Sequence, residues 1–284
     1  MGGILTAVRR IPCYQVDAFT TQAFSGNPAA VCPLDAWLPA ETMQKIAAEN
    51  AVSETAFLVP RGVDWEIRWF TPEVEVDLCG HATLATAFVL MTELEPGRTE
   101  TRFHSQAGPL AVTRAGDAYT LDFPARPPVR AEAPAGLLEA LGAHPIEVAR
   151  ARDLVIVLRD AAMVRELKPD FLALARLPDV FAVCCTAPGT GRDADVDFVS
   201  RFFAPAEGVP EDPVTGSSHC TLAPFWANRL GKDRLRARQV SRRGGEIDCV
   251  LAGDRVLLGG RAVLVKTGTL LLPDLREPRT EGPG

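Results

Sequence analysis

Two stretches of this sequence place small polar residues directly before an apolar run. They are residues 79–85, CGHATLA, and residues 212–223, DPVTGSSHCTLA. Each apolar run predicts a buried helix, whose free N-terminal amides and positive dipole end bind anions. The groups that could touch a ligand there are Gly80, His81, Asp212, Gly216, Ser217 and Ser218. An ordinary helix cap is the alternative for either stretch alone.

Two residues elsewhere could complete such a site. Glu54 lies in AVSETAFLV, where apolar neighbours would partly remove its carboxylate from water, as a general acid/base requires. Asn27 precedes Pro28 in GNPAAV, so its backbone should be extended and its amide could face a ligand. The alternatives are a capping Glu after Ser53 and a plain turn at Asn27.

The chain contains an internal repeat that relates the two helical stretches. RWFTP at 68–72 recurs as RFFAP at 201–205, and each precedes one of the glycine-containing stretches. Further on, segments 105–125 and 241–262 match in length, and each has a central Gly-Asp that is typical of a hairpin turn. The repeat predicts two homologous lobes, 1–125 and 126–284, joined by the Pro-rich linker 126–136. Residues 274–284 are expected to form a frayed tail.

Each lobe should consist of strands, one helix and further strands. The helix at 81–94 is apolar on nearly every face, which predicts burial on all sides. Its counterpart at 217–230 ends before Gly231 and contains Pro224, which predicts a kink or an irregular first turn. The fold class is therefore α+β, with two lobes that each wrap a curled sheet or barrel around a central buried helix.

Composition excludes several classes of function. The 284 residues are 47% hydrophobic and 23% charged with a formal net charge of -6, so we expect a soluble protein that does not bind nucleic acid. No apolar run is long enough for a membrane span, and the cytoplasm is the expected location. Seven scattered Cys, four His and the lack of glycine-rich nucleotide motifs predict neither a metal nor a cofactor.

An ordered set of motifs along the chain resembles the motifs of a known protein family. The chain resembles the phenazine-biosynthesis PhzF-like family, which has the diaminopimelate epimerase-like fold. The matching motifs cover nearly the whole chain and are GNPAAV (26–31), SETAF (53–57), RWFTP (68–72), CGHATLA (79–85), DPVTGS (212–217) and QVSRRGG (239–245). Each motif is weak alone, but the ordered set is highly specific.

The resemblance implies a homodimer with a site between the lobes that binds a small carboxylate substrate. The family's acid/base Glu falls on Glu54, and its further site residues fall on His81, Asp212 and Ser217. In the member that names the family, a Glu moves a proton between ring carbons of a dihydro-hydroxyanthranilate without a cofactor. We therefore predict Glu54, His81 and Asp212 as catalytic residues. The predicted substrate-binding residues are Asn27, Gly80, Gly216, Ser217 and Ser218.

Two alternatives stay open at this stage. A two-cysteine racemase or epimerase would use Cys79 in CGH, but it needs a second thiol, and PVTG stands where one would be expected. Cys220 lies four residues after Gly216 and should fall one turn into the helix. The other alternative is a binding protein that keeps the cleft without turnover, because fold and site residues do not guarantee activity.

Overall fold

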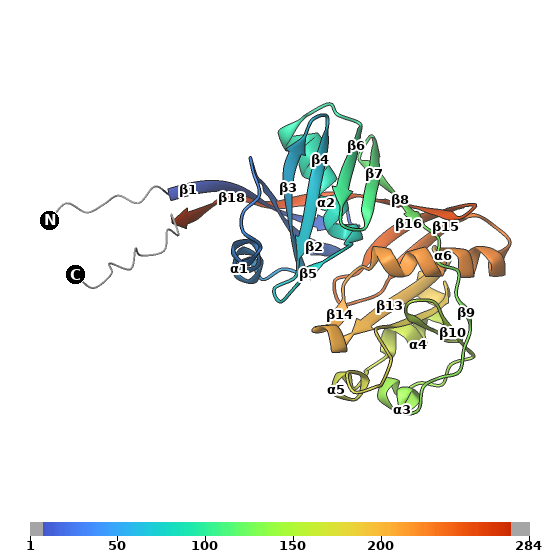
Figure 1. Cartoon of the computed structure of the whole chain (residues 1–284). Helices are drawn as coiled ribbons and strands as arrows, with labels where there is room; N and C mark the ends of the chain where they lie inside the picture. The colour runs from blue at the N-terminus through green and yellow to red at the C-terminus, as the bar shows by residue number, and fades with distance from the viewer. Residues whose placement is uncertain (1–7, 274–284) are drawn as a thin grey trace, which may run out of the picture.

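The computed structural model describes residues 8–273, so the predicted tail at 274–284 lies outside the described residues. The chain forms two α+β lobes that lie side by side (Figure 1). The predicted fold class is confirmed. The strands of the first lobe are β1 (Val8–Ala18), β2 (Asn27–Pro33), β3 (Glu54–Arg61), β4 (Asp64–Phe70), β5 (Glu75–Val76), β6 (Glu100–Ser105), β7 (Gly108–Ala115) and β8 (Ala118–Pro124). Its helices are α1 (Ala40–Asn50) and α2 (Gly80–Val89), and α2 continues as a π-helix, η1 (Leu90–Leu94).

The second half of the chain supplies the remaining elements. Its strands are β9 (Val129–Arg130), β10 (Glu147–Arg150), β11 (Leu154–Val157), β12 (Val183–Pro188), β13 (Phe198–Ala204), β14 (Val209–Asp212), β15 (Arg234–Gln239), β16 (Gly245–Ala252), β17 (Arg255–Gly260) and β18 (Ala262–Pro273). Its helices are α3 (Leu137–Leu141), α4 (Ala161–Glu166), α5 (Phe171–Leu174) and α6 (Gly216–Leu230), with short 3-10 turns at Gly191–Asp193 and Pro205–Glu207.

Each lobe has one central helix, as the apolar runs predict. Every residue of α2 except Phe88 is buried, and the helix packs against β1, β2, β3 and β8. The equivalent helix α6 packs against β15, β16 and β17. Side chains from both helices belong to one hydrophobic core that extends through the two lobes. No helix within residues 8–273 is long and apolar enough to cross a membrane.

The two Gly-Asp sites form the predicted hairpin turns. Gly116 between β7 and β8 has φ +64°, and Gly253 between β16 and β17 has φ +65°, a conformation that glycine adopts without steric cost. Strand β8 of the first hairpin pairs antiparallel with β17 of the second. The equivalent hairpins therefore join the sheets of the two lobes into one continuous, curled sheet.

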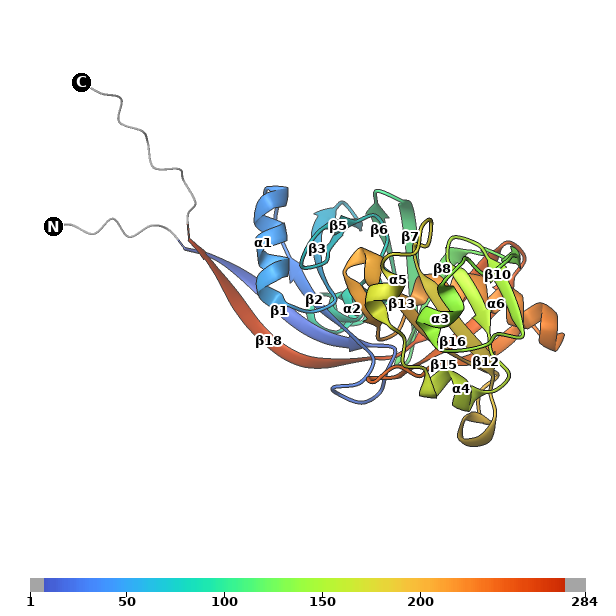
Figure 2. The same cartoon turned by 90° about the horizontal axis from the view of Figure 1, so that it is seen from below.

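The last strand of the chain returns to the first lobe. β18 pairs antiparallel with β1 along its whole length, from Val8 opposite Pro273 to Ala18 opposite Ala262. Figure 2 shows the two strands running together away from the rest of the molecule. The sequence repeat did not indicate this pairing, which brings the last strand of the chain back to the first. The exact boundary of the lobes stays a prediction.

Helix α6 continues through Pro224 as one element from Gly216 to Leu230, where the sequence predicts a kink or an irregular first turn. Because proline has no N–H, the carbonyl of Cys220, four residues earlier, loses its helical hydrogen bond. The backbone N–H of Arg126, in the segment between β8 and β9, donates to that carbonyl at 2.9 Å instead. This segment thus satisfies the group that Pro224 leaves free.

Candidate functional site

The N-termini of the two central helices meet where the lobes touch. A Cβ on Gly80 would lie 3.5 Å from the Cα of Gly216, and a Cβ on Gly216 would lie 3.5 Å from the Cα of Gly80. The residues before them, Cys79 and Thr215, are equivalent N-cap positions with extended backbones. Two positive helix ends and their free amides therefore converge on one place, as the paired motifs predict.

Glu54 and His81 are brought together at this junction. Glu54 opens β3, which pairs in parallel with β2, and His81 is the second residue of α2. The Nε2 atom of His81 lies 2.8 Å from the Oε2 atom of Glu54. The contact joins a carboxyl group and an imidazole ring that can pass or share a proton, and Oε2 is buried beside the ring.

Asn27 connects the two lobes at the site. Its Nδ2 atom lies 3.0 Å from Nδ1 of His81, in the first lobe, and 2.7 Å from Oδ1 of Asp212 and 2.9 Å from the carbonyl of Val214, in the second. An amide has two hydrogens for these three neighbours. When His81 carries a proton on Nδ1, Asn27 can donate to Asp212 and Val214, and when Nδ1 is bare it can accept from Asn27.

Gln239 and Thr215 hold the Asp212 segment in place. The fully buried Gln239 donates from Nε2 to the carbonyl of Asp212 at 2.7 Å and accepts from the backbone N–H of Thr215 at 2.8 Å. The Thr215 hydroxyl donates to Oδ2 of Asp212 at 2.5 Å. These contacts fix one carboxylate oxygen toward α6 and the other toward Asn27.

The protonation of His81 and Cys79 follows from burial and from Glu54. Burial disfavours the charged imidazole, but Cys79 and Glu54 outweigh it and raise the pKa of His81 well above its usual range. Burial first, and then Glu54, raises the pKa of the Cys79 thiol to about 11. Cys79 is therefore a neutral thiol near pH 7.

Asp212 is poised to exchange a proton near neutral pH. Burial raises the pKa of its carboxyl group to about 6, against the opposing effect of His81, and Glu54 raises it further. A group with such a pKa holds a proton at mildly acidic pH and releases it at neutral pH. The site thus combines three titratable groups in mutual contact or close to it, which is typical of catalytic centres.

The two predicted serines differ in their surroundings. Ser217, the second residue of α6, is only partly buried. The hydroxyl of Ser218 is buried and donates to the carbonyl of Thr215 at 2.9 Å, so it is already engaged within the first turn of α6. His219 beside it is buried too, and burial lowers the pKa of its ring to about 4. We therefore keep Ser217, and not Ser218, among the residues proposed to bind substrate.

One cluster has donors that a metal ion could use. Ligand atoms of Glu54, Cys79 and His81 lie within 4.8 Å of one another. The sulfur of Cys79, however, lies 3.5 Å from Nδ1 and 4.0 Å from Nε2 of the ring. The sulfur thus lies alongside the ring, and Glu54 already occupies Nε2, so an ion would have to displace that contact. We assign no metal to these residues.

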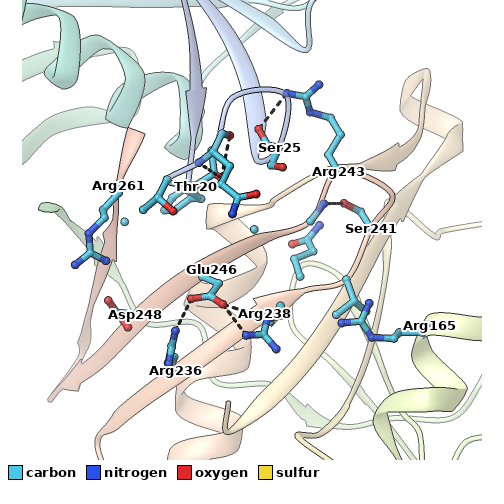
Figure 3. Close-up of a pocket in the computed structure, with 18 residues that line it drawn as sticks. Thr20, Ser25, Arg165, Arg236, Arg238, Ser241, Arg243, Glu246, Asp248 and Arg261 are labelled. Carbon is cyan, nitrogen blue, oxygen red and sulfur yellow. Dashed lines mark hydrogen bonds and ion pairs between the residues drawn. The ribbon is translucent and has the colours of Figure 1, made fainter. Parts of the chain in front are cut away.

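A polar cavity of about 680 Å³ lies next to this network (Figure 3). It is bounded by the loop of residues 19–25 from the first lobe and by β15, β16 and the loop between them from the second. Gln239 borders the cavity, whereas Glu54, His81 and Asp212 do not. Its arginines are paired with carboxylates, as in Arg238 with Asp195 and Glu246. The acid/base groups and this cavity are therefore neighbouring but separate features.

The site contains residues whose roles the sequence motifs did not predict. Gln239 and Thr215 lie inside recognised motifs, but nothing in a linear motif shows that their side chains meet. The spacing of 24 residues between them spans all of α6 and β15. The remaining predicted site residues lie on or next to the elements that converge at the lobe junction. They are Asn27, Glu54, Gly80, His81, Asp212, Gly216 and Ser217.

Comparisons with known proteins agree with this description. A family model described as phenazine biosynthesis-like protein matches residues 16–268. An uncharacterized isomerase of Pseudomonas aeruginosa is 52% identical over 259 residues, which cover 91% of this chain and 98% of that protein. The crystal structure of a PhzF-family phenazine biosynthesis protein from Enterococcus faecalis matches with a TM-score of 0.89 at 47% identity, and covers 93% of this chain and 100% of that one.

A more distant match confirms the fold class. The structure of a hydroxyproline epimerase from Agrobacterium vitis matches with a TM-score of 0.61 at 12% identity and covers 95% of each chain. The epimerase-like fold expected from the sequence is therefore present. From the family model and the high identity to these relatives, the chain belongs to the phenazine biosynthesis-like, or PhzC-PhzF, family.

Proposed function

We propose that this protein is an isomerase that moves a proton on a small unsaturated or cyclic carboxylate, with Glu54 as the acid/base and no cofactor in the reaction. The observation that supports this most directly is the 2.8 Å contact of the Glu54 carboxyl group with the buried His81, at the place where the two helix N-termini meet. The relatives named as isomerases support the general reaction class.

In this mechanism the substrate carboxylate binds at the helix ends. The backbone amides near Gly80 and Gly216 and the hydroxyl of Ser217 would hold it, and the two helix dipoles stabilise its negative charge. The same positive potential stabilises the negative charge that develops when a neighbouring C–H loses its proton. Binding therefore lowers the barrier to proton removal at the carbon next to the anchored group.

Glu54 would take that proton with its carboxyl group and return it to a second carbon of the same molecule. The bond between the first carbon and hydrogen breaks, its electron pair moves through the unsaturated system, and a new C–H bond forms at the second carbon. His81 would hold the carboxyl group of Glu54 in place through the 2.8 Å contact. Asp212, connected through Asn27, would bind a polar group of the substrate and assist the transfer.

A proton-exchange assay tests this function. Wild type, Glu54→Gln and the surface control Glu41→Gln are incubated in deuterated water with small unsaturated carboxylates, including dihydro-hydroxyanthranilate, and deuterium uptake is followed by mass spectrometry. We expect uptake by wild type and by Glu41→Gln, and a loss of about 10²- to 10⁴-fold in Glu54→Gln, the usual contribution of a general base. Undiminished uptake in Glu54→Gln would refute the role of Glu54.

The same assay addresses the binding-protein alternative. Tight binding of a carboxylate by the wild type without any deuterium uptake would support that alternative and contradict the isomerase. The homodimer and the cytoplasmic location expected from the sequence stay predictions.

A further inference from the structure

Arg243 ties the segment before Asn27 to the second lobe. This residue lies in the loop between β15 and β16, and its guanidinium reaches into the first lobe. Its Nε atom donates to the carbonyl of Gly26 at 2.8 Å, and its Nη2 atom donates to the carbonyl of Ser25 at 3.0 Å and to Oδ1 of Asp17 at 2.8 Å. Figure 3 shows the side chain reaching the loop that carries Ser25.

The segment that Arg243 holds has little freedom of its own. The N–H of Gly26 donates to the carbonyl of Gly244, next to Arg243, at 2.7 Å. Gly26 has φ +66°, and a Cβ on it would lie 2.2 Å from the carbonyl oxygen of Ala18, so no other residue fits without a shift. The backbone immediately before Asn27 is thus fixed by sterics on one side and by the second lobe on the other.

Asp17 keeps the guanidinium in place. Its side chain is 1% exposed, and its second oxygen accepts from the N–H of Phe24 at 2.7 Å. A buried carboxylate needs a partner, and Arg243 provides the ion pair. Asp17, near the end of β1, and Arg243 therefore connect the two lobes.

We propose that Arg243 is a positioning residue, which places the amide of Asn27 between His81 and Asp212 by fixing Ser25 and Gly26 against the second lobe. The inference rests on the proposed function, because it assigns Arg243 a role in that site. The hydrogen bonds of the Arg243 side chain go to Gly26, Ser25 and Asp17 and not to the acid/base groups, so its effect would pass through Asn27. A guanidinium suits this role because its planar fork holds several acceptors in fixed directions.

The test compares the double variant Asp17→Asn/Arg243→Gln with wild type and with Arg261→Gln. The double variant avoids leaving the buried Asp17 charge without a partner. Arg261 borders the same cavity but pairs with Asp117 on the surface, so it is a matched control. We expect kcat for proton exchange to fall about 10- to 100-fold with KM changed less than about 3-fold in the double variant, since misplacement of a catalytic group by about 1 Å has such effects.

A second arm asks whether Arg243 acts through Asn27. In an Asn27→Ala background, the added Asp17→Asn/Arg243→Gln change should lower kcat by less than about 2-fold, because coupled residues are not additive. An effect as large as in the wild-type background would overturn the proposal. Arg243→Lys keeps a charge opposite Asp17 but lacks the fork, and it replaces the double variant if thermal unfolding shows that the latter is not folded.

A third readout needs no substrate. The chain has four His, so the ring of His81 can be followed by NMR during a pH titration. The titratable groups that face this ring are Glu54, Cys79 and, through Asn27, Asp212. We expect the His81 titration to shift in the double variant and not in Arg261→Gln. An unchanged titration in the folded double variant would refute the positioning role, whether or not the enzyme turns over any compound tested.

Discussion

Gly80 and Gly216, the first residues of the two central helices, face each other across the lobes, and a Cβ on either one would lie 3.5 Å from the Cα of the other. They occupy equivalent places in the sequence repeat, so equivalent residues of the two halves of the chain meet here. Glycine at both positions lets the helix ends approach closely, and this brings the two sets of N-terminal amides together. The repeat therefore has a direct consequence for the site, because it doubles the positive potential at one point.

We predict that the size of the residue at position 80 controls this contact. A Cβ on Gly80 has ordinary contact distances, 3.5 Å to Gly216 and 3.8 Å to Phe123, so Gly80→Ala should change the unfolding temperature by less than about 4 °C. The larger side chain in Gly80→Val should destabilise by about 1–3 kcal/mol, the usual cost of overpacking, and should lower activity. Thermal unfolding and proton exchange measure both effects.

Gly268→Val is the matched control for that series. Gly268 lies in β18, and a Cβ there has nothing within 4 Å. The control should leave the unfolding temperature and the activity unchanged. Equal effects of valine at positions 80 and 268 would show that the helix contact is not what matters.

We predict that Cys79 is dispensable for proton transfer. Burial raises the pKa of its thiol to about 11, so almost none is thiolate at neutral pH. The equivalent N-cap in the second lobe is Thr215, whose hydroxyl is committed to Asp212, and Cys220 donates within its own helix to the carbonyl of Gly216. A two-thiol mechanism has no second thiol here. Cys79→Ser should retain deuterium exchange within about 3-fold of wild type, since the thiol is not the base.

The complementary result would favour the racemase. Loss of deuterium exchange in Cys79→Ser together with its retention in Glu54→Gln would identify the thiol, and not the carboxyl group, as the base. Cys184→Ser, at another buried cysteine, controls for the effect of removing a sulfur from the core.

Much of the fold could be predicted because the determining signals are local. The apolar run at 81–94 identified a helix that must be buried, and the glycines at 116 and 253 marked turns that require positive φ. The outcome at Pro224 could not be predicted, because the group that compensates for its missing N–H is the backbone of Arg126, nearly 100 residues away. The pairing of β18 with β1 was missed for the same reason.

The site was predictable to the extent that motifs mark it. Glu54, His81 and Asp212 were identified from residue type, neighbours and resemblance, and they lie around one junction. Gln239 and Arg243 lie in a recognised motif as well, but their roles depend on which backbone groups the fold places beside them. Such contacts between distant segments leave no periodic signal in the sequence.

We predict that Gln239 contributes strongly to the free energy of unfolding by holding the segment from Asp212 to Thr215 in place. Its amide makes hydrogen bonds to Asp212 and to both the backbone and the hydroxyl of Thr215, all in buried surroundings. Gln239→Ala would leave the N–H of Thr215 without its partner, so we expect a loss of about 2–4 kcal/mol in the free energy of unfolding. Urea titration measures this, with the exposed Gln22→Ala as control. A loss below about 1 kcal/mol would contradict the assigned role.

We predict that Asp212 makes the stability of the protein fall as the pH rises. Burial, opposed by His81 and aided by Glu54, raises the pKa of this carboxyl group from 3.8 to about 6. The folded state therefore binds the proton more tightly than the unfolded chain. This stabilisation is complete below about pH 3.8 and is lost as the pH rises through about 6. Between pH 5 and pH 8 the loss should be about 1 kcal/mol.

Asp212→Asn removes that titration while it retains an oxygen that can accept from Asn27. As the pH rises from 5 to 8, the free energy of unfolding of the variant should therefore increase by about 1 kcal/mol relative to that of the wild type. The variant should also lose activity. Urea titrations at both pH values measure the difference, with the exposed Asp254→Asn as control. If the difference between Asp212→Asn and wild type is the same at both pH values, Asp212 does not titrate in this range and its role as a proton-exchanging group is wrong.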